Sequence, residues 1–155
     1  MADGFTIEIS GDVVARLTRA AARLERPRDL MDAIGARMES NVAQRFISKT
    51  DPDGNLWLPL ASSTLKRKKG RGSTLISGKS EGTGGVGSLT HNAGDDFVEV
   101  GYDAAGYMQW HETGTSRMPR RPTLLGDFVT GRLGAQDEVD VLETIETWLG
   151  GLGIA

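Results

Sequence analysis

Apolar residues recur at helical spacing over most of the first 48 positions. An alternating apolar and polar segment at residues 5–9 predicts a short strand, which a Ser-Gly-Asp sequence then ends. Residues 12–24 repeat apolar side chains every three or four positions, which predicts a helix. Pro27 suits the first turn of a second helix that runs to about Ser48. We expect an antiparallel or angled helix pair, with a core face on the second helix formed by Leu30, Ile34, Met38, Val42 and Phe46.

The middle of the chain is rich in turn-forming residues. Residues 51–55, Asp-Pro-Asp-Gly-Asn, have the composition of a tight turn, and Trp57 follows among leucines. Ser62 is the predicted cap of a short helix over residues 63–69. Gly and Ser then dominate residues 70–85, which predicts a mobile segment.

Two short apolar runs predict a β-hairpin. Residues 86–91 and 97–101 flank an Asn-Ala-Gly-Asp turn, and such a pattern is typical of two antiparallel strands. Val98 and Val100 alternate with a glutamate, so one face of the second strand is expected to be buried.

Between the hairpin and the C-terminal helix the pattern is irregular. Residues 104–112 predict a short helix that places Tyr107, Trp110 and His111 near each other. Two prolines then bracket a pair of arginines, so residues 117–123 are expected to be extended and to lie outside the centre of a sheet.

The last third of the chain contains a clear amphipathic pattern that Gly150 and Gly151 end. It predicts a helix with an apolar core face and an acidic face toward solvent. The predicted core face carries Val139, Leu142, Ile145, Trp148 and Leu149, and the acidic residues are Asp137, Glu138, Asp140, Glu143 and Glu146. Together these elements predict one α+β domain over residues 1–155.

The amino-acid composition excludes several classes of functional site. A chain of 155 residues with 38% hydrophobic and 25% charged residues is typical of a single globular domain. The absence of Cys excludes a disulfide scaffold, a Cys-ligated metal and a thiol nucleophile. The two histidines, His91 and His111, would need carboxylates to complete any metal site. No run approaches the roughly 18 apolar residues of a membrane helix, so we expect synthesis in the cytoplasm and no membrane partner.

Charge is concentrated in one segment. The net charge is −3, yet residues 61–82 carry six basic residues and one acidic residue. Such a cluster forms a solvated or protein-facing surface, or it neutralises DNA phosphates without reading sequence. No aromatic residue interleaves it, so stacking on single-stranded bases is not supported. Both interpretations stay open for Lys66, Arg67, Lys68, Lys69 and Arg71.

Catalytic motifs match only formally. Residues 77–80 resemble the end of a phosphate-binding loop, but the preceding Gly is misplaced and no helix follows. Residues 78–82 fit G-x-S-x-G around Ser80, yet without the strand and helix that a nucleophile elbow requires. His111 begins an H-E-x-x-H pattern that Thr115 breaks. We therefore expect no enzyme, no cofactor and no metal, and we interpret His111 as a packed, hydrogen-bonded structural residue.

Three short motifs follow one another along the chain, at Asp51 to Leu60, at Tyr107 to Gly114 and at Pro119 to Gly126. Taken in this order, they resemble the phage virion morphogenesis family, which includes tail completion proteins of Mu-like and P2-like contractile-tailed phages. The first resembles D-x-x-G-x-x-W-x-x-L, the second Y-A-x-x-H-Q-x-G, and the third P-x-R-P-x-L-G. Met108 and Glu112 depart from the usual small residue and Gln of the second motif, and a leucine expected after Ser77 and Gly78 is missing. The resemblance spans about residues 10–150, and its motif positions are Asp51, Gly54, Trp57, Tyr107, His111, Gly114, Pro119, Arg121, Pro122 and Gly126.

The resemblance implies a structural, non-enzymatic protein of the virion neck or tail. It would be a tail-terminator-like subunit of a homo-oligomeric ring, expected to be a hexamer, made in the host cytoplasm. Its implied partners are the tail tube and the head-completion or connector proteins, with non-specific contact to DNA in the channel. Two other hypotheses remain: a nucleic-acid-binding accessory protein that uses residues 66–71, and a small hydrolase that uses Ser80 or His111.

Three further expectations concern individual segments. Trp57 is predicted to anchor the core. Arg120 and Arg121 are predicted to serve assembly or a local fold contact, with the acidic C-terminal helix as a candidate partner. Residues 66–87 are predicted to be mobile in the free subunit and to order against a protein partner, rather than DNA, in the assembled neck.

Overall fold

The computed structural model describes residues 12–68, 85–103 and 105–152, and the fold is α+β. The predicted strand at residues 5–9 and most of the Gly-rich segment, including Lys69, Arg71 and Ser80, lie outside these residues. In chain order the elements are α1 (Asp12–Glu25), α2 (Arg28–Ser48), α3 (Ser62–Arg67), the 3-10 turn η1 (Val86–Ser88), β1 (Leu89–Ala93), β2 (Val98–Tyr102), α4 (Met108–Thr113) and α5 (Ala135–Gly150).

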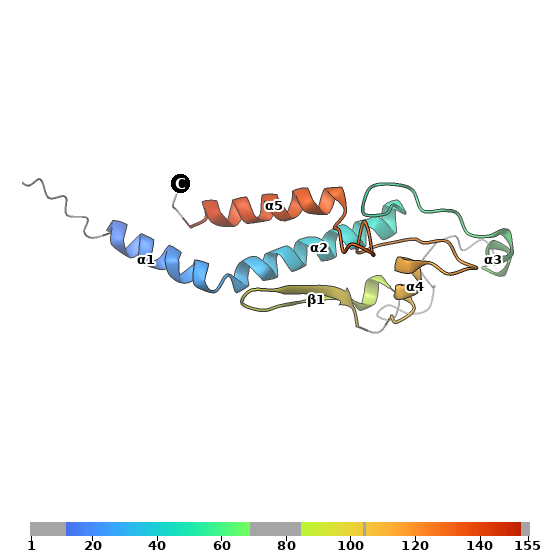
Figure 1. Cartoon of the computed structure of the whole chain (residues 1–155), viewed down its shortest axis with the longest axis horizontal. Coiled ribbons are helices and arrows are strands. Elements are labelled where there is room, and N and C mark those ends of the chain that lie inside the picture. The colour runs from blue at the N-terminus through green and yellow to red at the C-terminus, as the bar shows by residue number, and fades with distance from the viewer. Residues whose placement is uncertain (1–11, 69–84, 104, 153–155) are drawn as a thin grey trace, which may run out of the picture.

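Helix α2 is the centre of the fold. It lies between α5 on one side and the β1–β2 hairpin on the other, so the body has three layers (Figure 1). The predicted core face of α2 is confirmed, since Leu30, Ile34, Met38, Val42 and Phe46 are all buried. Two apolar clusters share this helix. One joins its first half to Val98, Val100, Val141, Ile145 and Trp148, and the other joins its second half to Trp57, Ala105 and Met108.

The hairpin forms as predicted, with its boundaries shifted by a few residues. β1 and β2 are antiparallel, and His91 pairs with Val100 in their register. Residues 86–88 form the 3-10 turn instead of strand. At the other end of the hairpin, the Gly94 amide donates to the Phe97 carbonyl at 2.8 Å and closes the turn.

A glycine allows β1 to lie directly on α2. A Cβ at Gly35 would stand 2.2 Å from Cδ2 of His91, which no packed structure tolerates. The His91 ring bridges Asp32 and Glu39 of α2, with its two nitrogens 3.2 and 3.0 Å from their carboxylate oxygens. These contacts, that of Glu39 first, hold the pKa of His91 above its ordinary value.

Replacing Gly35 by Ala is therefore expected to lower the free energy of unfolding by about 1–3 kcal/mol, because the hairpin must move off α2. Gly150→Ala is the matched control, since a Cβ there meets open space; it should be neutral or stabilising by up to about 1 kcal/mol. Chemical denaturation of both variants is the measurement. A Gly35→Ala variant as stable as the wild type would show that the close approach is not required.

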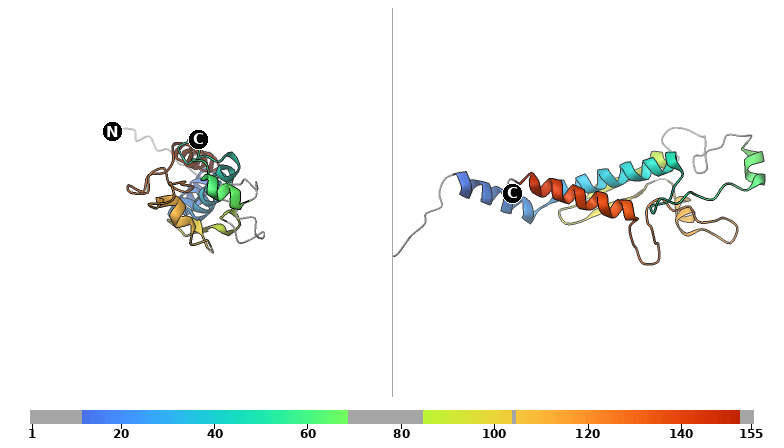
Figure 2. Two further views of the ribbon diagram at one scale, coloured as in Figure 1. Left: turned by 90° about the vertical axis from the view of Figure 1, so that its right-hand side faces the viewer. Right: turned by 90° about the horizontal axis from the view of Figure 1, so that it is seen from above.

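The N-terminal helices differ from the expected core-forming pair. Two residues, Arg26 and Pro27, separate α1 from α2, and the chain does not turn back on itself there (Figure 1). Helix α1 instead continues away from the body (Figures 1 and 2). Among its described side chains, Ala20 is the one that is buried. The packing partners of α2 are therefore α5 and the hairpin.

Helix α5 forms where it was predicted, but only part of its expected core face is buried. Ile145 and Trp148 pack against the first half of α2 as predicted, whereas Val139, Leu142 and Leu149 are exposed. Asp137 and Asp140, which were expected to face solvent, are buried, at 0% and 4% exposure. The aspartates face inward because α2 offers them cationic and amide partners.

The short helix α3 and the segment after it also differ in detail from expectation. Ala61, not Ser62, is the N-cap residue of α3, and Ser62 makes no capping hydrogen bond. Both ends of the predicted mobile segment 66–87 are structured: Lys66 and Arg67 are helical, and Gly85 is buried against Phe46 and Met108. None of the helices in the described residues has the length and apolarity needed to cross a membrane.

Candidate functional site

The first motif builds a tight turn that delivers Trp57 to the core. The Asp51 carboxylate accepts hydrogen bonds from the backbone amides of Asp53 and Asn55 at 3.0 and 2.8 Å. Gly54 has a φ of +86°, a conformation that disfavours residues with a Cβ. The chain then pairs back on itself, and the Trp57 amide donates to the Lys49 carbonyl at 2.8 Å.

Trp57 joins the first motif to the third. Its side chain is 8% exposed and meets the edge of Phe46 at a ring separation of 5.8 Å. The indole Nε1 donates to the Pro122 carbonyl at 3.1 Å. The predicted core anchor is thus confirmed, and its polar atom has the partner that a buried indole needs.

Arg121 fastens the segment that follows Trp57. It is 3% exposed, and its guanidinium donates to the carbonyls of Leu58 and Pro59 at 2.8 and 2.9 Å. Its own amide donates to the His111 carbonyl at 2.8 Å. Through its side chain and its backbone amide, this one residue therefore connects the segment after Trp57, helix α4 and the third motif.

Arg120 points elsewhere and closes a different loop. Its guanidinium donates to the Glu112 carbonyl at 2.6 Å and to the Leu125 carbonyl at 3.1 Å. Two motif glycines make room around this segment. A Cβ at Gly114 would lie 3.1 Å from the Arg120 amide nitrogen, and one at Gly126 would lie 2.8 Å from the Leu133 carbonyl. Both arginines therefore make local fold contacts, with backbone carbonyls.

Glu112 is a buried acceptor for the end of the third motif. It is 5% exposed, and its Oε1 accepts from the Thr123 amide, the Thr123 hydroxyl and the Leu124 amide at 2.6, 2.5 and 2.9 Å. The Thr123 hydroxyl also lies 2.7 Å from the Tyr102 hydroxyl. A Gln at this position would present one oxygen to the same donors, which accounts for the usual family residue.

His111 is packed, as predicted, but it is not hydrogen-bonded in the way expected. Its ring meets the edge of Tyr107 at 6.1 Å, and its Nδ1 has no hydrogen-bond partner among the described residues. Burial, with the charges of Arg121 and Lys68 adding to it, lowers the pKa of His111 to about 4. Trp110, predicted to lie close by, is half-exposed on the same helix.

The low pKa of His111 predicts that the free energy of unfolding depends on pH. A histidine that stays neutral in the fold but ionises in the unfolded chain stabilises the fold fully above pH 6.5 and loses that contribution as pH falls toward 4. We expect the free energy of unfolding of the wild type to decline over this range relative to His111→Asn, which cannot ionise. Denaturant titrations at several pH values measure the difference. A constant difference between the two proteins would contradict a depressed pKa.

Sequence reasoning missed a polar network between α2 and α5. Arg45 is buried and forms an ion pair with Asp137, and it also donates to the Thr123 carbonyl at 2.7 Å. The Asn41 amide donates to both Asp137 and Asp140, at 2.9 and 2.7 Å. Arg37 pairs with Asp140 at 2.8 Å and lowers the pKa of that carboxyl. The acids of the C-terminal helix thus bind Arg45 and Arg37, where Arg120 and Arg121 were predicted.

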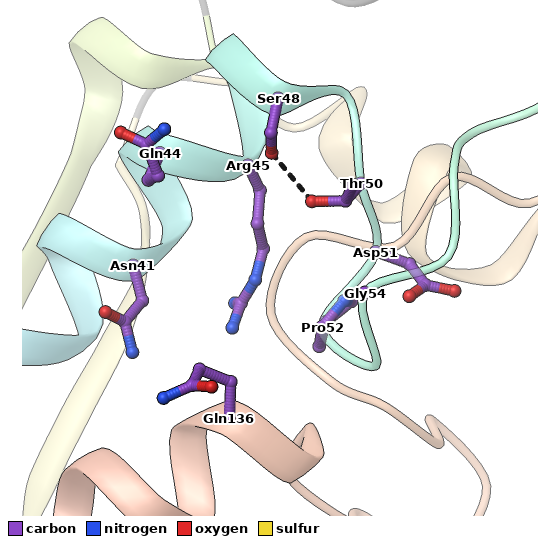
Figure 3. Close-up of a pocket in the computed structure, with 9 residues that line it drawn as sticks. All are labelled: Asn41, Gln44, Arg45, Ser48, Thr50, Asp51, Pro52, Gly54 and Gln136. Carbon is purple, nitrogen blue, oxygen red and sulfur yellow. Dashed lines mark hydrogen bonds between the residues drawn. The ribbon is translucent and has the colours of Figure 1, made fainter.

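Beside this network lies a small polar cavity of about 250 Å³. Figure 3 shows Asn41 and Arg45 of α2 pointing toward Gln136 of α5. The turn that holds Pro52 lies on the right of this view. The cavity marks where the first motif, α2 and α5 meet. Its lining residues are Asn41, Gln44, Arg45, Ser48, Thr50, Asp51, Pro52, Gly54 and Gln136.

The basic cluster stands apart from the motif residues. Lys66 and Arg67 lie on α3, at the end of the molecule opposite α1 (Figure 1), and both are exposed. Lys68 follows directly and is partly buried. Lys69 and Arg71 fall outside the described residues. No buried residue of α3 ties this helix to the core.

The comparison with protein-family models supports a phage structural protein. A model of the phage virion morphogenesis family matches residues 11–150. The chain therefore belongs to this family, and its role lies in the assembly of the phage particle. Comparisons with curated proteins and with solved structures return no match.

Proposed function

We propose that this protein completes the phage tail and joins it to the head at the neck, as a ring of identical copies, with six copies as the expected number. Membership of the virion morphogenesis family supports this role. The observation that carries the proposal is the amount of large apolar surface left open on several elements. Val129, Leu56 and Ile47 are 91%, 77% and 74% exposed, an arrangement typical of interaction sites.

A ring places a particular demand on its subunit. Head-to-tail repetition requires two different surfaces that complement each other, in contrast to the single self-complementary patch of a twofold dimer. The exposed apolar residues of this chain meet that demand because they lie on separate elements. They fall on α1, at the end of α2, near the first motif, in the loop before α5 and on α5 itself.

One of these surfaces is a rigid loop before α5, which projects from the body in Figure 2. Asp127 and Arg132 pair across its base, and Gly131 turns the chain with a φ of +70°. The Arg132 guanidinium binds Asp53 at 2.7 and 3.1 Å, which fixes the loop to the first motif. Phe128 and Val129 are therefore presented in a set conformation, which reduces the entropy lost on binding a partner.

The remaining assignments follow from the same proposal. The partners are further copies of the chain, the tail tube and the head-completion or connector proteins. DNA in the channel makes non-specific contacts at most. The exposed basic residues of α3 face a protein partner, because a dense basic collar would hold DNA that has to slide. We assign no enzymatic role and no cofactor.

A phage that lacks this gene provides the direct test. We expect it to release full heads and unattached tails, seen by negative-stain electron microscopy, and wild-type protein supplied from a plasmid should restore joined particles. Asp95→Ala, an exposed change in the hairpin turn, serves as a matched control that should restore them equally. Normal particles without the protein would contradict the proposal.

A nucleic-acid accessory role is the second candidate, and the basic end at α3 is the observation that favours it. It makes a different prediction for the same phage, namely joined particles with a packaging defect. It also predicts DNA binding whose affinity falls steeply with salt, because the contacts would be to phosphates.

A further inference from the structure

The outer face of α5 carries an apolar stripe that no other part of the described chain covers. Val139, Leu142 and Leu149 are 48%, 59% and 43% exposed, and Ala135 and Glu146 lie in the same row. These five positions are separated by four, three, four and three residues. That spacing is the seam of a helix that packs lengthwise against another helix.

The orientation of α5 explains why this stripe faces outward. Its inner face is fixed by two buried aspartates, which bind Arg45, Arg37 and Asn41 of α2. Val141, Ile145 and Trp148 pack against α2 on the same inner side. The ion pairs and this packing together hold the apolar stripe at the surface.

Helix α1 carries a second stripe of the same kind. Val14, Leu17, Ala21 and Leu24 are exposed, and the spacing between them is three, four and three residues. The helix projects beyond the body, so most of its length lies away from the rest of the chain (Figures 1 and 2).

The α1 stripe does not reach the α5 stripe of its own subunit. Among the described residues, the two helices are in contact at the C-terminal end of α5, where Arg23 stands over the Trp148 ring at 5.1 Å and Ala20 and Leu152 are buried. This contact uses a different side of α1, the one that carries its arginines. Val139 and Leu142 lie two to three turns farther along α5.

We propose that the α1 stripe of one subunit packs against the outer α5 stripe of a second copy of this chain. The large apolar part of each stripe has the same length, since Val14 to Leu24 and Val139 to Leu149 each span ten residues, or about 15 Å. Their helices also differ in charge. α1 carries three arginines and two acids, and α5 exposes Glu138, Glu143 and Glu146, so long-range attraction favours their approach although the arginines lie on another side of α1 from the stripe.

This contact would form the interface between neighbouring subunits of the proposed ring. The inference therefore rests on the proposed function. Because the two stripes lie on different helices, each copy offers one to the preceding subunit and one to the next. The projecting helix thus acts as an arm, and α5 is its receptor on the neighbour.

Site-directed cross-linking tests this pairing, and the chain is well suited to it because it contains no cysteine. Subunits with Leu17→Cys or Ala21→Cys are mixed with subunits of different mass that carry Leu142→Cys, and are then oxidised. The two α1 positions cover parallel and antiparallel packing. Ala22→Cys, on the opposite face of α1, is the matched control. We expect a mixed dimer on a non-reducing gel with at least one stripe position and at least tenfold less with Ala22→Cys.

A second variant distinguishes loss of assembly from loss of folding. Leu17→Glu should leave the melting temperature of the subunit unchanged, because Leu17 is 52% exposed, while lowering self-association at least tenfold in sedimentation velocity. If wild-type rings form and particles are joined, but no stripe-specific cross-link appears or Leu17→Glu assembles normally, the α1–α5 contact is wrong and the proposed function stands. A wild-type chain that remains monomeric at all concentrations, in a phage that joins its tails without it, overturns both.

Discussion

Replacing Asp137 by Ala is expected to lower the free energy of unfolding of the subunit by about 3–5 kcal/mol. The carboxylate is fully buried, and it is the anionic partner of Arg45, which is itself 5% exposed. Its loss leaves a guanidinium charge in the interior with only the Thr123 carbonyl and one face of the cavity near it. Asn41 loses one of its two acceptors as well.

Urea denaturation of the purified variant measures this effect. The adjacent exposed residue provides the control, since Glu138→Ala should change stability by less than about 0.5 kcal/mol. A double variant, Arg45→Met with Asp137→Leu, should recover most of the loss, because it removes both charges and fills the volume. An Asp137→Ala variant within about 1 kcal/mol of the wild type would mean that the ion pair does not hold α5 on α2.

Replacing Trp57 by Ala is expected to cost about 3–5 kcal/mol, because the indole fills the space between Phe46, Met108 and the third motif. Thermal and chemical denaturation give the value. Leu56→Ala is the control, as this neighbouring residue is 77% exposed and should matter little to the free subunit.

A third variant separates volume from hydrogen bonding at this position. Trp57→Phe keeps most of the apolar contact but leaves the Pro122 carbonyl without its donor, which should cost about 1–3 kcal/mol. Equal stability of Trp57→Ala and Leu56→Ala would place Trp57 outside the core.

The parts of the fold that the sequence predicts correctly depend on local chemistry. The turn at residues 51–55 follows from Asp51 and Gly54, whose effects act within four residues. The span of α2 and its core face follow from spacing along one helix. The hairpin follows from two apolar runs and the turn between them. In each case the deciding contacts are close in sequence.

The orientation of α5 could not be predicted in this way. Apolar spacing assigns Val139 and Leu142 to the core together with Ile145 and Trp148, but the first two are exposed because the same helix also buries two aspartates against the cationic and amide groups of α2. Arg45 and Asp137 are 92 residues apart, so no local pattern connects them. The signal present in the sequence was an arginine on the predicted core side of α2, one position before the buried Phe46, and an arginine buried there needs an acidic partner or several carbonyl acceptors.

For the motif residues too, the local pattern was predictable from the sequence and the long-range contacts were not. Their order and spacing indicated the family, and the family match over residues 11–150 confirms it. Their mutual contacts were not predictable, because Arg121 binds carbonyls 62 and 63 residues away. Sequence reasoning assigned Arg120 and Arg121 either to assembly or to a local fold contact. In the free subunit both residues make the local contact.

Electron cryomicroscopy of the virion neck tests the central claim most directly. We expect a closed ring of this chain between the top of the tail tube and the head connector, with the apolar residues of neighbouring copies buried against each other. A neck without this protein, or one in which its copies do not touch, would contradict the account.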